Sequence, residues 1–367
     1  MAPYLILGVV VTFLAAISHR VSQKYSVKTY PQHLGHAVAP AQRWTLFDLV
    51  AVAALIAFSG LRHDVGTDYP VYELVFNKLD ASDWSASLAD STQEIGYTLL
   101  MLVTKQATDD AQAIFWIAAI LTVVPVYVAI KRLTLNPGFA VALYVAFEYA
   151  SSFNALRQCM AAAILFLAWT YFGKRNVVFW ALAVVAISFH MTALMAVVVL
   201  VFARRLSPSL RTAAAFLLGG VLVAGIMNQI PALGAILEGI NPRYVDYLDS
   251  GHTGIGAYLQ ILAYGALLVY ALNVGRRNSP LTDMDRQLGV YILAGIALMI
   301  VGTQAIVMFR LASYFTIFIV LLVPNRISRT RDRTASTFLI LAAVTGYFIM
   351  DIANYGEVVP YETYVAF

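Results

Sequence analysis

The chain has 367 residues, of which 60% are hydrophobic and only 12% are charged, with a formal net charge of +4. This charge is too small to cover the surface of a soluble domain of this length, which excludes a soluble globular protein. The apolar residues come in blocks of membrane-spanning length, which predicts an all-α polytopic membrane protein. The single cysteine, Cys159, excludes a disulfide framework and a thiolate metal site.

About twelve apolar segments are predicted to cross the membrane and to form one integral domain over residues 1–367. In the first segment the positive charges follow the apolar run instead of preceding it, so we interpret it as a retained span and not as a signal peptide. In chain order the predicted spans are 3–18, 46–60, 111–130, 138–152, 154–172, 176–189, 191–203, 211–228, 257–274, 287–303, 307–324 and 335–351.

Lysine and arginine cluster in every second loop, which makes those loops cytoplasmic. Both termini then lie on the extracytoplasmic side. Residues 61–110 form an outer segment with short helices lying on the membrane, and residues 229–256 form a second outer loop. Six cations remain on the outer side: Arg62, Lys78, Lys105, Arg157, Arg243 and Arg310.

Four of these outer cations are arginines near span ends, and two of them, Arg157 and Arg310, are surrounded by apolar residues. A guanidinium at membrane depth costs at least about 2–3 kcal/mol unless it is paired or lines a wet cavity. Arginine also suits a bidentate grip on phosphate. Each one could instead snorkel to the headgroups or pair with an acid. Together the four favour a site for an anionic substrate.

Three further ionisable residues are candidates for proton transfer or sugar binding. His190 ends a span on the outer side, where it is either a general base or a histidine that interacts with the last helix carbonyls. Asp68 precedes Tyr69 and Pro70 in a turn that leads into a helix, so capping is its expected role. Asp64 lies beside Arg62 and is the better chemical candidate.

The motifs that are missing narrow the function further. No cluster has convincing metal-ligand spacing, and there is no Gly-x-Ser-x-Gly elbow, His-Glu-x-x-His sequence or P-loop. The short basic inner loops leave no room for a nucleotide-binding domain. Protease and ATP-driven transport functions therefore lose support, and the many outer tyrosines are typical of an interfacial belt.

A series of short motifs in a fixed order resembles the EpsG family, a branch of the Wzy-type polysaccharide polymerases. The motifs are R-x-D-V-G-T-D-Y-x-x-Y (62–72), E-I-G-Y (94–97), F-N-x-x-R-Q-x-x-A (153–161), F-H-x-T-A-L (189–194), R-x-x-x-Y-F (310–315) and V-P-Y (359–361). The resemblance implies a GT-C-like or Wzy-like helix bundle. It also implies polymerisation of polyprenyl-pyrophosphate-linked oligosaccharide repeat units at the outer face of the bacterial cytoplasmic membrane.

In this chemistry the growing glycan leaves its pyrophosphate carrier and joins the terminal sugar of an incoming lipid-linked unit. The resemblance places Arg157 and Arg310 on the leaving group, with Arg62 assisting them. His190 is the expected base, and Asp64 is the second choice. No metal or other cofactor is then required. The expected substrate-binding residues are Arg62, Asp68, Tyr69, Tyr72, Glu94, Asn154, Gln158, Arg243 and Tyr314, of which Arg243 rests on topology alone.

Other functions fit part of the same pattern. A flippase for lipid-linked oligosaccharides would also need cations in a cavity, but such proteins usually contain internal repeats and none is visible. A membrane acyltransferase would need its histidine and arginines on the cytoplasmic side. A ligase that moves finished glycan to another acceptor would have a similar site. The expected partners are the lipid-linked substrates and the bilayer, with a chain-length regulator and a flippase of the same pathway as candidates, and no nucleic acid.

Overall fold

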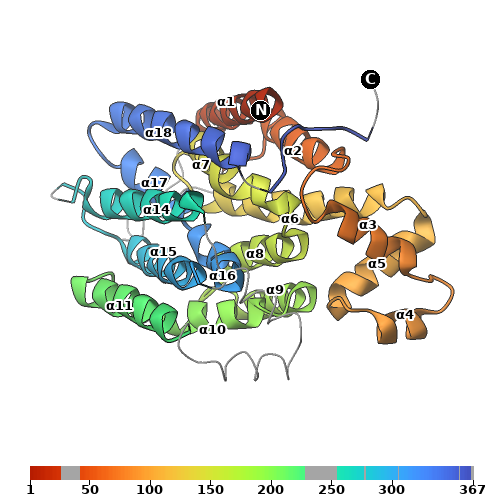
Figure 1. Cartoon of the computed structure of the whole chain (residues 1–367). Helices are drawn as coiled ribbons and strands as arrows, with labels where there is room; N and C mark the ends of the chain where they lie inside the picture. The colour runs from red at the N-terminus through yellow and green to blue at the C-terminus, as the bar shows by residue number, and fades with distance from the viewer. Residues whose placement is uncertain (26–41, 228–253, 277, 305, 355, 365–367) are drawn as a thin grey trace. The chain divides into compact units, whose positions relative to one another are not determined.

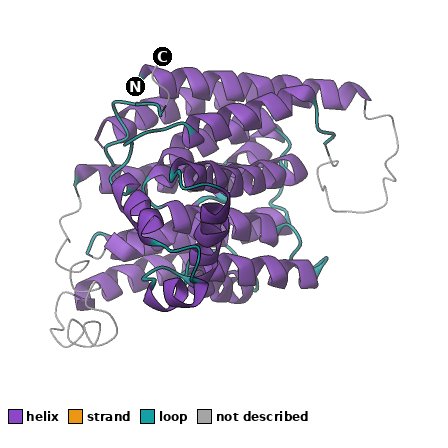
Figure 2. Ribbon diagram, turned by 90° about the vertical axis from the view of Figure 1, so that its right-hand side faces the viewer, coloured by secondary structure: helices purple, strands orange, loops and turns teal. Residues whose placement is uncertain are grey.

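The computed structural model describes residues 1–25, 42–227, 254–276, 278–304, 306–354 and 356–364. These residues form helices joined by loops and contain no strand (Figure 2). Their one β-type pairing is an isolated antiparallel bridge between Arg62 and Thr363. The expectation of an all-α protein is confirmed.

The chain divides into two compact units, of which the first combines Met1–Leu194 with Thr334–Phe367. Within it the helix α18 packs against the 145–153 region, where Tyr347 stacks on Phe147 with ring centroids 4.9 Å apart. The helices of this unit, coloured from red to green with α18 in blue in Figure 1, are α1 (Ala2–Tyr25), α2 (Leu46–Gly60), α3 (Tyr69–Lys78), α4 (Trp84–Asp90), α5 (Ile95–Ala107), α6 (Gln112–Leu133), α7 (Pro137–Tyr144), α8 (Leu156–Trp169), α9 (Asn176–Phe189) and α18 (Arg333–Asn354).

The second unit spans Met195–Arg333. Its helices are most of α10 (Ala193–Ala203), then α11 (Leu210–Met227), α14 (Ile255–Asn273), α15 (Asp283–Gly302), α16 (Ile306–Thr316) and α17 (Ile319–Ser328). The helix α15 is the centre of this unit and packs against α11, α14, α16 and α17. Its start is fixed by a capping box, in which Thr282 accepts from the Asp285 N–H at 3.1 Å and Asp285 accepts from the Thr282 N–H at 2.9 Å.

Six described helices are long and apolar enough to cross a membrane, which makes this a multi-pass membrane protein. Five shorter apolar helices coincide with other predicted spans: Leu46–Gly60, Leu156–Trp169, Asn176–Phe189, Ala193–Ala203 and Arg211–Ala224. The predicted span 138–152 is instead broken. It begins as α7 and continues as a π-helix, Val145–Tyr149, and a 3-10 turn, Ala150–Phe153. Such local changes of helix type often mark functional regions.

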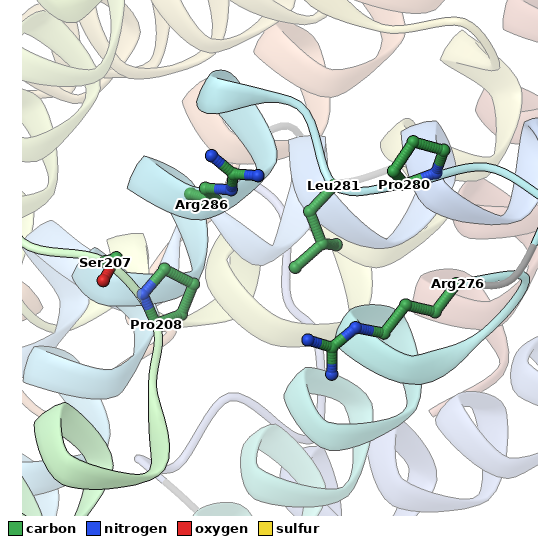
Figure 3. Close-up of a pocket in the computed structure, with 6 residues that line it drawn as sticks. All are labelled: Ser207, Pro208, Arg276, Pro280, Leu281 and Arg286. Atoms are coloured by element: carbon green, nitrogen blue, oxygen red, sulfur yellow. The ribbon is translucent and has the colours of Figure 1, made fainter.

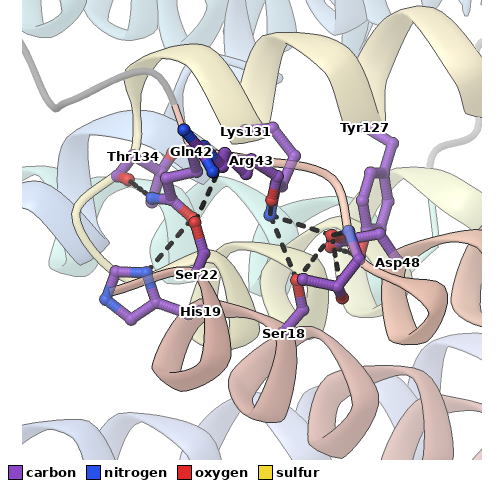
Figure 4. Close-up of polar contacts among 10 residues, drawn as sticks. Ser18, His19, Ser22, Gln42, Arg43, Asp48, Tyr127, Lys131 and Thr134 are labelled. Carbon is purple, nitrogen blue, oxygen red and sulfur yellow. Dashed lines mark hydrogen bonds and ion pairs between the residues drawn. The ribbon is translucent and has the colours of Figure 1, made fainter. Parts of the chain in front are cut away.

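A buried ion pair ties three helices of the first unit together. Lys131 Nζ on α6 lies 3.0 Å from Asp48 Oδ2 on α2, and both side chains are almost completely buried. Ser18 on α1 and Tyr127 on α6 donate to the same carboxylate at 2.5 and 2.9 Å (Figure 4). The four groups satisfy one another, as buried charges must.

The second unit contains a comparable network and a pocket. Arg329 Nη1 lies 2.7 Å from Asp285 Oδ2, and the fully buried Arg326 donates from Nε to Ala271 O at 3.0 Å. The pocket has a volume of about 280 Å³ and contains none of the predicted site residues (Figure 3). It is lined by Ser207, Pro208, Arg276, Pro280, Leu281 and Arg286.

Candidate functional site

Three helix ends meet at the predicted residues Glu94, Arg157 and His190. Glu94 precedes α5, Arg157 lies in the first turn of α8, and His190 directly follows α9. The helices α8 and α9 pack side by side, and α5 packs against α9 (Figure 1). Glu94 occupies the N-cap position of α5, yet its side chain makes no capping hydrogen bond. The carboxylate is therefore available to residues of other helices.

The Glu94 carboxylate binds His190 with one oxygen and Arg157 with the other. His190 Nδ1 lies 2.6 Å from Oε1, which also accepts from the Met191 backbone N–H at 3.3 Å. Arg157 Nη1 forms an ion pair with Oε2. The three side chains, here called the Glu94 cluster, are 18–24% exposed, so they are sheltered but remain open to a substrate.

The protonation of Glu94 fixes the hydrogen-bonding role of the histidine. Burial alone would raise the pKa of the Glu94 carboxyl, but the hydrogen bond from His190 and the charge of Arg157 outweigh it and lower that pKa to about 2. An ionised carboxylate only accepts hydrogen bonds, so Nδ1 of His190 must carry the proton. Among the described residues Nε2 has no hydrogen-bond partner. When the ring carries only the Nδ1 proton, Nε2 offers a lone pair to a substrate.

Two tyrosines hold the arginine of the cluster. The Tyr97 ring centroid lies 5.9 Å from Arg157 Cζ, and the Tyr72 hydroxyl is hydrogen-bonded to the same guanidinium. The two rings meet edge to face with centroids 6.0 Å apart. Arg157 Nε is buried and meets no acceptor within the described part of the chain. A buried donor without a partner is costly, and such groups call for an explanation such as a functional role.

A glycine allows α5 to approach the end of α9. A Cβ built on Gly96 would lie 2.7 Å from the backbone oxygen of Ser188, which is closer than real Cβ atoms come. Gly96 is two residues after Glu94 and Ser188 two before His190. The absence of a side chain at this position therefore helps to bring the two groups within hydrogen-bonding distance.

The aspartates of the 61–68 loop lie outside the hydrogen bonds of the cluster. Asp64 is exposed, with a backbone φ of 51°, and remains a candidate for contact with substrate. Asp68 is the N-cap residue of α3, as predicted, but its side chain makes no capping hydrogen bond. Tyr69 is buried, stacks on Phe115 with centroids 4.2 Å apart, and donates to Gln112 Oε1 at 2.7 Å.

Three further predicted residues are buried. Arg62 is 0% exposed and donates from Nη1 to Ser59 O at 2.6 Å. Burial lowers its pKa to about 10, so it stays charged at neutral pH. Asn154 donates from Nδ2 to Gly356 O at 3.1 Å. Gln158 follows Arg157 on α8. Arg62 and Asn154 make contacts that serve the fold, while their predicted contact with substrate stays a prediction.

Three predicted residues lie outside the described part of the first unit. Arg310 and the buried Tyr314 lie on α16 in the second unit. Arg243 and most of the outer loop 229–256 lie outside the described residues. Among the described residues no group of three His, Cys, Asp or Glu side chains could hold a metal ion.

Sequence reasoning missed the bridging place of Glu94 and the contact of Tyr97 with Arg157. The sequence predicts contact with substrate for Glu94, and Tyr97 is one of the outer tyrosines, most of which are explained by an interfacial belt. One signal was present, because Glu94 and Tyr97 share the E-I-G-Y motif and are three residues apart across a helix start. That spacing turns both side chains to the same side.

The fold and the site define a multi-pass helical membrane protein with a sheltered acid, histidine and arginine at converging helix ends. A family model matches residues 45–363, and the chain belongs to the EpsG family. Comparisons with curated proteins and with solved structures gave no match. Membership of this family indicates a polysaccharide polymerase role and confirms the expectation from the motifs.

Proposed function

We propose that the protein polymerises polyprenyl-pyrophosphate-linked oligosaccharide repeat units, with the Glu94 cluster at its active site. The observation that carries the proposal is the bridge that Glu94 makes between His190 and Arg157. It presents a proton acceptor and a guanidinium side by side. Glycosyl transfer from a pyrophosphate donor needs one of each, a base for the acceptor hydroxyl and a cation for the leaving group.

In the proposed reaction His190 Nε2 takes the proton from a hydroxyl group of the acceptor sugar. The acceptor oxygen then forms a bond to the anomeric carbon of the donor glycan as the bond from that carbon to the pyrophosphate oxygen breaks. The polyprenyl pyrophosphate leaves with the bonding electron pair. Glu94 keeps the ring oriented through Nδ1 and stabilises the imidazolium that forms. Asp64 is the second candidate for the base.

We assign the stabilisation of the negative charge that develops on the pyrophosphate to arginine side chains. Arg157 shares its guanidinium with Glu94 and can offer its remaining N–H groups to phosphate oxygens. Arg310 is assigned the same task from its place in the R-x-x-x-Y-F motif. With two guanidinium groups in this role, the reaction needs no divalent metal ion.

The remaining assignments follow from the sequence. We infer about twelve spans with both termini outside, because basic residues cluster in every second loop. On that topology the Glu94 cluster faces the extracytoplasmic side of a bacterial cytoplasmic membrane. Tyr72, Gln158 and Tyr314, with Arg243 in the outer loop, are assigned to substrate binding. A flippase and a chain-length regulator of the same pathway are the proposed protein partners.

The test is the formation of a polymer ladder by the purified protein from a defined polyprenyl-pyrophosphate-linked repeat unit of its own pathway. The ladder is expected to survive a chelator and to be lost in Arg157→Ala and His190→Gln. Arg132→Ala is the matched control, since Arg132 also lies over a tyrosine ring, that of Tyr171 at 4.1 Å, but belongs to a predicted cytoplasmic helix end.

Two other outcomes would replace the polymerase assignment. A single transfer to a different acceptor, without a ladder, would make the protein a ligase. No covalent product, with movement of lipid-linked units across liposome bilayers, would make it a flippase. A ladder that disappears with the chelator and returns with Mg²⁺ would overturn the metal-independent mechanism alone.

A further inference from the structure

The C-terminal strap, defined as residues 356–364, lies against the 61–68 loop. Four backbone hydrogen bonds of 2.7–3.3 Å join them, at both ends of the contact. They run from Tyr364 N to Leu61 O, from His63 N to Glu362 O, from Gly66 N to Glu357 O and from Thr67 N to Gly356 O. Residues nearly 300 positions apart in the sequence therefore form one paired segment, and both carry motifs of the family.

Side chains fasten the strap to two helices as well. The ring of Tyr361 stacks on Phe58 of α2 with centroids 4.0 Å apart, and its hydroxyl donates to Phe58 O at 2.6 Å. Tyr4 of α1 donates to Val358 O at 2.6 Å. The strap is thus held along its length and not only at one point.

Arg62 is buried beneath this contact in a cage of aromatic rings. Its Cζ lies 4.6 Å from the ring centroid of Phe153 and 4.9 Å from that of Phe115. Among the described residues its Nε and Nη2 have no hydrogen-bond partner. The rings supply cation–π attraction in their place, and desolvation strengthens such contacts. The enclosed guanidinium anchors the loop to Phe153, the residue before Asn154.

Asn154 connects the strap to the Glu94 cluster. Its Nδ2 donates to Gly356 O at 3.1 Å, and its Oδ1 accepts from Thr67 Oγ1 at 3.2 Å. Its backbone oxygen accepts from Tyr72, whose hydroxyl also contacts Arg157. Arg157 is only three residues further along the chain. The strap, the loop and the start of α8 therefore share one side chain.

We propose that Arg62, Asn154 and Tyr361 are positioning residues, which hold the C-terminal strap on the 61–68 loop and thereby hold Arg157 and Tyr72 in place. This assignment rests on the proposed function, because the site that is held is the Glu94 cluster. It changes the role of Arg62 and Asn154 from contact with substrate to support of the groups that touch it. It also gives the V-P-Y motif a task in the same site.

The only cysteine of the chain provides a reporter for this arrangement. Cys159 is two residues from Arg157, is partly exposed, and lies near Tyr72 and Tyr144. Its rate of alkylation by N-ethylmaleimide, followed by mass spectrometry of the full chain in detergent, reports on the packing around Tyr72. The measurement needs no substrate, so its outcome does not depend on whether the protein is a polymerase.

Asn154→Ala and Tyr361→Phe are expected to raise the alkylation rate by about 3-fold or more below the unfolding temperature, since local opening exposes the thiol. Tyr361→Phe keeps the stacked ring and should have the smaller effect. Tyr364→Phe is the matched control. Tyr364 lies on the same strap, and the variant loses only a hydroxyl contact with Asp110. Its alkylation rate should equal that of the wild type.

The polymer ladder assay measures the activity of the same variants. The positioning variants should lower kcat and leave KM nearly unchanged, since Arg157 acts on charge that develops only in the transition state. Wild-type alkylation rates in both Asn154→Ala and Tyr361→Phe would overturn the inference. If rates rise in both variants while the wild-type protein makes no ladder, the strap is confirmed and the polymerase proposal alone fails.

Discussion

At the scale of single residues, Glu94 organises the site because its two oxygens take different partners. One orients the ring of His190, and the other pairs with Arg157. Arg157 lies 63 positions from Glu94 in the sequence and His190 lies 96 positions from it, so only the fold brings the three residues together. Sequence patterns could select each residue as a candidate, from its place at a span end or in a motif. They could not show that the acid binds both of the others.

The ionisation of Glu94 leads to a prediction for stability against pH. The pKa of its carboxyl is lowered in the folded protein from 4.5 to about 2, so the stabilisation is complete above the unfolded value and is lost as the pH falls toward the folded value. In thermal unfolding, the wild type should be more stable than Glu94→Gln. The difference in the free energy of unfolding should be constant above about pH 5 and should shrink below it. A margin that stays constant down to about pH 3 would show that the partners do not hold the carboxylate ionised.

At the scale of helices, the close approach of α5 and α9 depends on Gly96. Gly96→Ala places a methyl group against the Ser188 backbone and should cost about 1–3 kcal/mol through overpacking. It should also reduce polymerisation nearly as much as Glu94→Gln, because the two helix ends are forced apart. The polymerisation rate and the thermal unfolding of each variant are measured together.

The control for this prediction is Gly346→Ala on α18. A Cβ there meets nothing within 4 Å in the described part of the chain, so a gain of up to about 1 kcal/mol is expected. If Gly96→Ala behaves like Gly346→Ala in both measurements, the geometry of the Glu94 cluster does not depend on the close approach of α5 to α9.

The buried ion pair of the first unit gives a second prediction at this scale. Lys131→Met leaves the Asp48 carboxylate unpaired among α1, α2 and α6, and should lower the free energy of unfolding by about 3–5 kcal/mol. Chemical denaturation in detergent measures it. Arg286→Met breaks an exposed pair with Asp283 and should cost less than about 1 kcal/mol. Equal losses in the two variants would contradict the buried role of Lys131.

Much of the helical structure could be predicted, because long apolar runs are a strong signal. Short helices are expected within residues 61–110, and α3 and α5 lie in this segment. The break of the predicted span 138–152 into three helix types could not be predicted, since most of its residues are apolar and give no signal for a change of helix type. The pairing of the C-terminal strap with the 61–68 loop joins distant segments and has no periodic signal.

At the scale of the whole molecule, the positive-inside pattern predicts which side each loop faces. In a Cys159→Ser background, Thr92→Cys in the outer segment should react with a membrane-impermeant maleimide in intact cells. Ser207→Cys, in a basic loop, should react only after permeabilisation. Both positions are exposed, so a difference reports on the membrane side and not on burial. The reverse labelling would invert the topology and move the proposed site to the cytoplasmic face.

The most direct test of the account is a double-mutant cycle in the polymer ladder assay. Initial rates are compared for the wild type, Glu94→Gln, His190→Gln and the double variant. If Glu94 acts by orienting His190, losing the base should cost about 10²–10⁴-fold, and the double variant should be no slower than His190→Gln alone. Losses that multiply in the double variant would show that the two residues act independently, and would contradict the role of Glu94 in orienting His190.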